Sequence, residues 1–396
     1  MLKQGPLVLG TLSWARAHPL LALWFAAFSM WVATYLSLPT IGVLAERKAA
    51  LSFGWIGLMH GAYGLALVLS RIPIGKLGNL VEQKILLTAG LLITTAGLLI
   101  VPLFFSPATL VVSRSFLGVG TGFWVIYTVA YVRHSPKSTG EAMAEVSLAY
   151  GAGITIAGLL GGLLVQLKGD FAPFWAGIGI STIGLIALIV GVREQPMPRS
   201  LQRIRLWRLL TRPQLLLVSM VAMLLFFAAF ATIWGFSQNY AVHRFQASSL
   251  WLGVIAFSSL LSYALTMRAS AKIRGRLGIV PAIGGGVALV SIGVLLIPIS
   301  PSLYTLALLH GLMGVGLGMA YPILMSLSIE GGDIPEFRSE AMGMFQSIYA
   351  LGIFLGPLAS GKIIQAFGMT AMFVANGAVV LAALGIFLAF RRVLRG

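Results

Sequence analysis

Apolar residues in this chain gather in long continuous segments that recur from residue 20 to the last arginine cluster. A helix needs about 20 mostly apolar residues to cross a hydrocarbon core of about 30 Å. Turn residues and charges separate segments of this length, so the pattern predicts an all-α membrane protein. The twelve expected spans are 20–44, 54–76, 84–105, 107–132, 141–167, 171–193, 213–241, 248–273, 279–299, 301–328, 340–367 and 369–391.

The longest polar interruption runs from Arg193 to Arg212 and holds two prolines and six arginines. We interpret it as a cytoplasmic linker between two halves of the chain. The expected organisation is an N-terminal six-helix bundle at 1–195, a linker at 196–212 and a C-terminal six-helix bundle at 213–396.

The two halves repeat each other at a nearly constant spacing of 196 to 199 residues. An even number of helices in each half gives both halves the same orientation in the membrane. Parallel repeats of this kind are a known transporter architecture, with the binding site at their interface. The matching segments are 55–57 with 251–253, 114–122 with 310–318, and 141–143 with 340–342.

Composition and charge agree with this architecture. Hydrophobic residues make up 58% of the 396 residues and charged residues 9%, which excludes a soluble globular protein. The net charge is +17, but most basic residues, Arg71 among them, fall at one side of the predicted spans. The positive-inside rule then places both termini in the cytoplasm of a multi-pass inner-membrane protein, and the basic character does not indicate nucleic-acid binding. The first apolar stretch lacks a cleavage site, so we expect no processing.

Short motifs in the repeated segments resemble those of the major facilitator superfamily, and the resemblance covers the whole chain. The loop after the second span reads Gly75-Lys76-Leu77-Gly78-Asn79 and continues to Lys84, similar to the family's G-x-L-x-D-R-x-G-R-K loop. Asn79 replaces the acid. In the family this acid joins a cytoplasmic charge relay that helps to hold the outward-facing state, so the resemblance implies a weaker or different latch here.

Other motifs of the family lie on the fourth, fifth and eleventh spans. Segment 114–122 is close to R-x-x-x-G-x-G, and segments 153–162 and 352–361 are similar to the antiporter motif G-x-x-x-G-P-x-x-G-G. Small residues let helices approach closely and proline lets a helix bend, so plain helix packing also explains these motifs. The positions that we assign to gating are Gly75, Lys76, Asn79, Glu141, Gly158, Gly356 and Pro357.

Arg114 lies about two turns into the fourth span, where a buried arginine is costly and therefore a functional hypothesis. Gly118, Thr121, Val125 and Thr128 share its helix face, which predicts a polar wall of a cavity. Arg114 is expected to contact an anionic group of the substrate or to bias a nearby proton acceptor. The alternative is a structural hydrogen bond to backbone carbonyls.

None of the ten acidic residues lies at the centre of a predicted span. Glu145, one turn deeper than Glu141, is the one plausible carboxylate for proton coupling, and pairing with a cytoplasmic lysine or arginine is its alternative role. His60 and His310 titrate near neutrality and are further candidates, with packing as the alternative. The repeat places His310 at the position of Arg114 in the second half.

Aromatic and amide side chains recur at helical spacing in several spans. In the family that the chain resembles, helices 1, 4, 7 and 10 line the cavity, so these side chains are expected to line it here. Interfacial aromatic belts are the alternative explanation. The residues that we assign to substrate binding are Trp31, Tyr35, Arg114, Trp124, Tyr127, Trp234, Gln238, His310 and Gln346.

No enzyme motif, nucleotide-binding loop or metal-binding cluster is present in the sequence, so we expect a non-enzyme without cofactor or metal. The sequence predicts a monomeric secondary transporter whose partners are a small-molecule substrate, membrane lipids and protons. Proton-coupled export of an organic or amphipathic solute is the favoured function. The alternatives are uniport or symport of an organic anion or anionic lipid through Arg114, and a membrane sensor that has lost transport.

Overall fold

The computed structural model describes residues 18–78, 80–192, 211–330 and 338–395. The predicted linker lies outside these residues except for 211–212, and Asn79 lies outside them too. Helices account for the secondary structure of the described residues. The helices of the first half are α2 (Pro19–Leu36), α3 (Leu38–Arg47), α4 (Phe53–Leu77), α5 (Gln83–Leu103), α6 (Pro107–Gly122), α7 (Trp124–His134), α8 (Thr139–Lys168) and α9 (Ala172–Gly191).

The second half follows the same plan. Its elements are α10 (Pro213–Ala231), a π-helix η2 (Thr232–Phe236), α11 (Ser237–Phe245), α12 (Ser249–Leu277), α13 (Ile279–Leu296), η3 (Ile297–Ile299), α14 (Leu303–Glu330), α15 (Arg338–Ala389) and η5 (Arg391–Arg395).

The prediction of twelve spans is confirmed within the described residues. Eleven helical segments are long and apolar enough to cross a membrane, and the last of them, Ala341–Ala389, has 49 residues. Gly368 has φ 83° and ψ 171° inside α15, a backbone conformation that glycine adopts readily. The helix therefore breaks there, and α15 supplies both the eleventh and the twelfth span.

Three spans that the sequence predicts as continuous helices are interrupted near their middles. Ser37 separates α2 from α3, where Pro39 enters the helix, and Phe123 separates α6 from α7 after a glycine-rich turn. The seventh span changes to a π-helix at Thr232–Phe236 before it continues as α11. Such breaks are tolerated at membrane depth where the backbone is buried in protein or borders a cavity.

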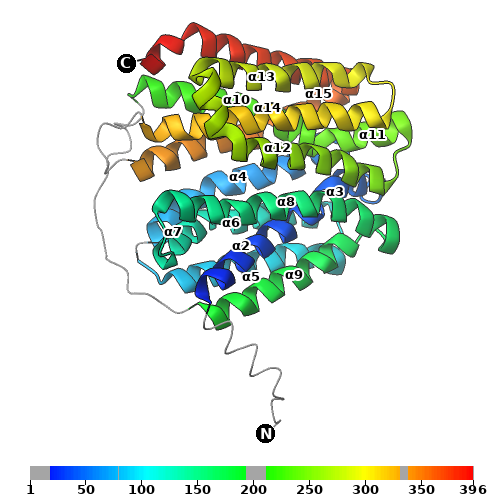
Figure 1. Ribbon diagram of the computed structural model, residues 1–396. Coiled ribbons are helices and arrows are strands. Elements are labelled where there is room, and N and C mark those ends of the chain that lie inside the picture. Colours follow the sequence, from blue (N-terminus) through cyan, green and yellow to red (C-terminus); the bar gives the residue numbers. More distant parts are fainter. Residues whose placement is uncertain (1–17, 79, 193–210, 331–337, 396) are drawn as a thin grey trace.

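Two bundles lie one above the other in Figure 1, with the first half below and the second half above. In the first half α2 packs against α8 and α9, and in the second α10 packs against α15 and α12 against α14. The bundles meet where α4 packs against α15 and α8 against α12. We call the left end in Figure 1, where α7 lies, the linker end, and the opposite end, where α3 and α11 lie, the far end.

The packing reproduces the sequence repeat. A Cβ atom added to Gly118 of α6 would collide with the carbonyl oxygen of Tyr63 on α4. A Cβ added to Gly314 of α14 would collide in the same way with the carbonyl oxygen of Ser259 on α12, and both residues lie 196 positions further along the chain. The glycines of the repeated motif thus allow the same close helix contact in each half.

The far end is closed by direct contact between the halves. A Cβ added to Gly162 of α8 would collide with the carbonyl oxygen of Ser249, and one added to Gly361 of α15 with that of Phe53. These two contacts are also related by the repeat. The backbones of α8 and α12, and of α15 and α4, therefore touch at the far end with no side chain between them.

Candidate functional site

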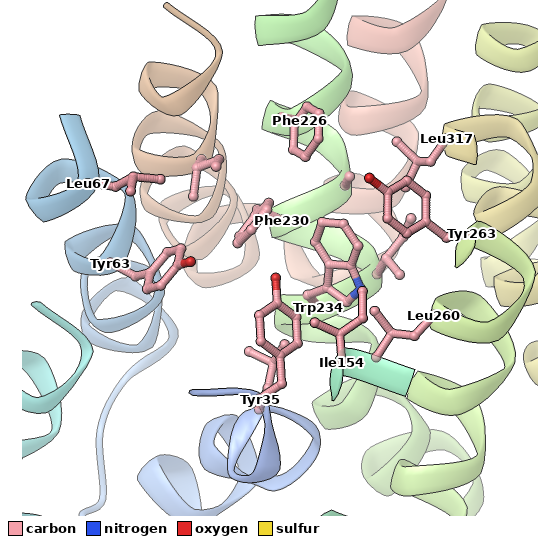
Figure 2. Close-up of a cluster of buried hydrophobic side chains, with 14 of the residues drawn as sticks. Tyr35, Tyr63, Leu67, Ile154, Phe226, Phe230, Trp234, Leu260, Tyr263 and Leu317 are labelled. Atoms are coloured by element: carbon pink, nitrogen blue, oxygen red, sulfur yellow. The ribbon is translucent and has the colours of Figure 1, made fainter. Parts of the chain in front are cut away.

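A cavity of about 50 Å³ lies between the two bundles and is bordered mostly by aromatic side chains. Figure 2 shows Tyr35 and Tyr63 of the first half facing Phe230 and Trp234 of the second. Its lining residues are Trp31, Tyr35, Tyr63, Leu67, Arg71, Thr121, Tyr150, Phe226, Phe230, Trp234, Tyr263, Tyr321, Tyr349 and Ile353.

Aromatic rings bridge the halves around this cavity. The ring of Tyr63 on α4 stacks on Phe230 of α10 with centroids 6.1 Å apart, and Tyr150 of α8 meets Tyr263 of α12 edge to face at 6.4 Å. Thr121 of α6 donates a hydrogen bond to the Tyr63 hydroxyl at 3.0 Å. The cavity wall is thus apolar in its ring faces and polar in its hydroxyl groups, as is typical of sites for organic ligands.

Arg71 is the charged residue of the cavity lining. Only 8% of it is exposed, and its Nη1 donates to the Tyr349 hydroxyl at 3.1 Å and to the Gln346 carbonyl at 3.4 Å, both on α15. Its guanidinium also lies 5.6 Å from the Tyr349 ring centroid, and its Nε has no partner. The sequence analysis placed Arg71 with the basic residues of the cytoplasmic side. Arg71 lies inside α4, as the predicted span 54–76 implies, and its side chain joins the two halves.

Arg114 is buried on α6 beside the cavity, with 2% exposed. Its guanidinium lies 4.9 Å from the ring centroid of Tyr63, which lines the cavity, and its Nε has no hydrogen-bond partner. The ring contact is a cation–π arrangement, which stabilises a desolvated guanidinium in part. The recorded contacts of both buried arginines are with tyrosines and a backbone carbonyl, and none is with a described carboxylate.

The other residues assigned to substrate binding fall into two groups. Trp31, Tyr35 and Trp234 line the cavity, each less than a tenth exposed. Trp124 packs edge to face on Trp31 at 5.5 Å, and Tyr127 is fully buried away from the lining.

The two amides assigned to substrate binding lie outside the lining. Gln238 donates to the Ile233 carbonyl across the π-helix at 3.2 Å. Gln346 contributes its backbone carbonyl to Arg71. The Gln238 amide thus binds the backbone of the π-helix, and Gln346 joins α15 to Arg71 through its backbone.

The residues assigned to proton coupling lie apart from one another. His310 is fully buried on α14, with Nδ1 2.8 Å from the Leu306 carbonyl and Nε2 without a partner. Glu145 lies at the linker end of α8, where it binds Lys137 and accepts a hydrogen bond from Tyr131 at 3.2 Å. The hydrogen bond to the Glu145 carboxylate raises the pKa of Lys137. These contacts are the alternative role that the sequence analysis gave to Glu145.

The described residues assigned to gating lie on three helices, α4, α8 and α15. Gly75 has open space around it and Lys76 is exposed, both near the linker end of α4, while Glu141 completes the capping box of α8 with Ser138. Gly158 lies on the face of α8 that touches α12 of the other half.

The two residues of α15 that the sequence assigned to gating differ in what they touch. Gly356 packs against the backbone of Phe227 in its own half. The carbonyl of Pro357 touches Gly57 of α4 in the other half. Gly158 and Pro357 are therefore placed where the bundles must move relative to each other in any rocking motion.

Sequence reasoning missed most of the cavity lining. Tyr150 and Tyr349 had a signal, since both belong to the repeated segment after Glu141 and Glu340. Phe226, Phe230 and the remaining lining tyrosines had none, because their spacing does not differ from that of ordinary apolar positions. Among the described residues there is no group of three or more His, Cys, Asp or Glu side chains that could hold a metal ion.

Comparisons with known proteins place this geometry in context. The family model described as Major Facilitator Superfamily matches residues 23–333. An uncharacterized MFS-type transporter of Methanocaldococcus jannaschii is 24% identical over 368 residues, covering 87% of this chain and 93% of that protein.

Two solved structures share the fold. A bacterial homologue of the human lysosomal transporter Spinster, in an inward-facing and unoccupied conformation, has a TM-score of 0.80 at 16% identity, covering 96% of this chain and 98% of that one. The human organic anion transporter MFSD10 has a TM-score of 0.69 at 20% identity, covering 97% and 100%.

Proposed function

The chain belongs to the major facilitator superfamily, and on that premise we propose that it carries an organic anion with an aromatic or otherwise apolar body through the cavity between its halves. Transport proceeds by alternating access, with residues 1–195 rocking against 213–396. The observation that carries the proposal is the pair of buried arginines at the cavity, Arg71 and Arg114, whose contacts are with tyrosines and backbone.

A buried charge is costly unless it is paired, and both guanidinium groups have an Nε atom without a partner. An anionic group in the cavity would supply the missing countercharge, and guanidinium groups bind carboxylate and phosphate well. Arg71 lines the cavity directly, while Arg114 acts from behind the Tyr63 ring.

The aromatic lining supports an apolar body for the same solute. Ring faces of Trp31, Phe230 and Trp234 offer area for stacking, and the hydroxyl groups of Tyr35 and Tyr63 offer hydrogen bonds. A human organic anion transporter shares the fold of this chain, and an organic anion is the class of substrate that we propose.

Export is the direction that we propose for such a solute. Moving one elementary charge across 100 mV is worth about 2.3 kcal/mol, and a membrane potential that is negative inside drives an anion outward. Export then needs no coupling ion. Proton-coupled export through Glu145 or His310 is the competing proposal, and it predicts that Glu145→Gln or His310→Ala abolishes efflux driven by a pH gradient in vesicles.

Thermal unfolding of the purified protein tests the substrate class, because a ligand that binds the native state raises the unfolding temperature. The probes are three naphthalene derivatives of one shape, a carboxylate, its amide and the corresponding amine. We expect the carboxylate to stabilise the wild type most, and Arg71→Gln and Arg114→Gln to lose that preference. Arg268→Gln, at an exposed arginine of α12, is the matched control and keeps it.

The proposal is refuted if the amide or the amine stabilises the wild type as well as the carboxylate does. It is also refuted if the preference survives in both cavity variants. Counterflow of the labelled carboxylate in proteoliposomes then checks that a bound anion is also transported.

A further inference from the structure

At the far end, one carboxylate of the first half is held by two side chains of the second half. Glu46, in the last turn of α3, accepts a hydrogen bond from Nδ2 of Asn239 at 2.7 Å, and its other oxygen lies 2.5 Å from Nε2 of His243. Asn239 and His243 are four residues apart on α11 and share one helix face. Nδ2 of Asn239 also donates to the Gly42 carbonyl at 3.2 Å. We call Glu46, Asn239 and His243 the far-end latch.

The far-end latch has a buried inner part and a solvent-exposed outer part. Asn239 is fully buried and its Oδ1 has no partner, while the side chains of Glu46 and His243 are 21% and 52% exposed. His60 of α4 adds a second unpartnered atom, since its Nε2 lies beside Gly42 close to Asn239. A polar cluster of this kind, open at one side, is suited to binding and releasing a proton.

The other charged groups at this end include Lys168 of α8 and Lys362 of α15, both of which are exposed. Lys48 pairs with Asp170 at 2.8 Å within the first half, and Arg47 lies beside that pair. Arg244 follows His243 on α11 and is exposed. The charged residues of α12 lie toward its linker end, and η2 has none. Among the residues that the structure describes, Glu46 is thus the far-end carboxylate that joins the two halves.

We propose that Glu46 and His243 form a proton-binding site that sets how tightly the far end is closed. The two protonation steps have opposite signs. A proton on His243 turns its contact with Glu46 into an ion pair and tightens the latch, because charge-assisted hydrogen bonds are the stronger ones. A proton on Glu46 removes the negative charge that both partners bind, and so loosens the latch. Closure is therefore greatest when His243 carries a proton and Glu46 does not.

The latch lies at the far-end contact, where the ring of His243 is 6.0 Å from that of Phe53. With both termini in the cytoplasm, as we predict, the latch faces the outside of the cell. Protons would therefore reach it from outside without moving with the substrate, and external pH would regulate the transporter. The inference rests on the alternating access proposed above but not on the identity of the substrate.

Spin labels at the far end can measure this closure directly, with protons as the added ligand. The native chain has no cysteine, so Ser52→Cys and Ser248→Cys introduce the only thiols. Both serines are exposed and lie in different halves. Neither side chain makes a capping hydrogen bond to the helix that follows it. Distance distributions are recorded by pulsed electron resonance in lipid nanodiscs over a series of pH values, without substrate.

We expect the closed population to pass through a maximum and to fall at lower pH. In Glu46→Gln the ratio of closed to open molecules should fall by roughly three- to tenfold at the optimum, the size expected for losing a partly exposed charged hydrogen bond. The pH maximum should disappear in the same variant. Asp170→Asn is the matched control, because it removes a far-end carboxylate whose ion pair stays within one half.

Two outcomes overturn the proposal. One is a wild-type distribution that does not change with pH. The other is an equal effect of Asp170→Asn and Glu46→Gln, which would show a general effect of surface charge. Neither outcome depends on anion binding, so failure of the latch and failure of the proposed substrate class are distinguished by separate measurements.

Discussion

The hydrogen bond from Arg71 to the hydroxyl of Tyr349 joins α4 of the first half to α15 of the second, on the linker side of the cavity. If the halves rock, this bond must break when the linker end opens. Replacing Tyr349 with phenylalanine removes the hydroxyl but keeps the ring, which lies 5.6 Å from the guanidinium. The second acceptor, the carbonyl of Gln346, also stays in place. The substitution therefore isolates one bond across the interface.

The expected magnitude follows from the kind of bond. A hydrogen bond to a charged group contributes about 1.5–3 kcal/mol in soluble proteins. Measured bonds between membrane helices are weaker, with an average of about 0.6 kcal/mol and a maximum of about 1.7. Because Arg71 is charged and buried, we place this bond at about 1–2 kcal/mol, so that Tyr349→Phe lowers the ratio of closed to open linker ends roughly five- to thirtyfold.

Distances between spin labels at Gly140→Cys on α8 and Gly275→Cys on α12 measure that ratio. A side chain at either position meets open space, and the two helices face each other across the halves. Tyr304→Phe is the control, since it removes the hydroxyl of an exposed tyrosine of α14. We expect Tyr349→Phe to shift the distribution toward the longer distances and Tyr304→Phe to leave it unchanged. A shift smaller than twofold in Tyr349→Phe would refute the view that this bond stabilises the closed linker end.

Two further predictions concern helix contacts. Gly361→Leu places a side chain against the carbonyl of Phe53. Because overpacking costs about 1–3 kcal/mol, the distances between labels at Ser52→Cys and Ser248→Cys should lengthen at every pH. Gly179→Leu, where the added atoms meet open space, should not change these distances. Glu141→Ala breaks the capping box of α8 and should lower the free energy of unfolding by about 0.5–1 kcal/mol in a thermal melt, whereas a glutamine, which can also close the box, should restore most of it.

The fold was predictable because its main features are local in sequence. Apolar segments of sufficient length specify the spans, and glycine repeats specify close contacts, as the matching collisions at Gly118 and Gly314 show. The breaks at Ser37, Phe123 and the π-helix at 232–236 were not predicted, although Pro39 and a glycine-rich turn mark the first two. A helix in a membrane keeps its apolar composition through such a break, so hydropathy carries no sign of it.

Sequence reasoning reached the cavity through residues that are unusual in their own segments and through the family resemblance, which led to Trp31, Tyr35 and Trp234. Arg114 was found because an arginine two turns into a span is costly wherever its neighbours lie. Arg71 was missed because it is near the end of its span, where arginine is common and the positive-inside rule explains it. What makes Arg71 part of the site is α15, a helix nearly 280 residues further along the chain, which covers it with Tyr349. The same holds for Glu46 and α11 at the far end. Arg71 and Glu46 take their surroundings from the other half of the chain, so a reading of each span by itself cannot identify their contacts.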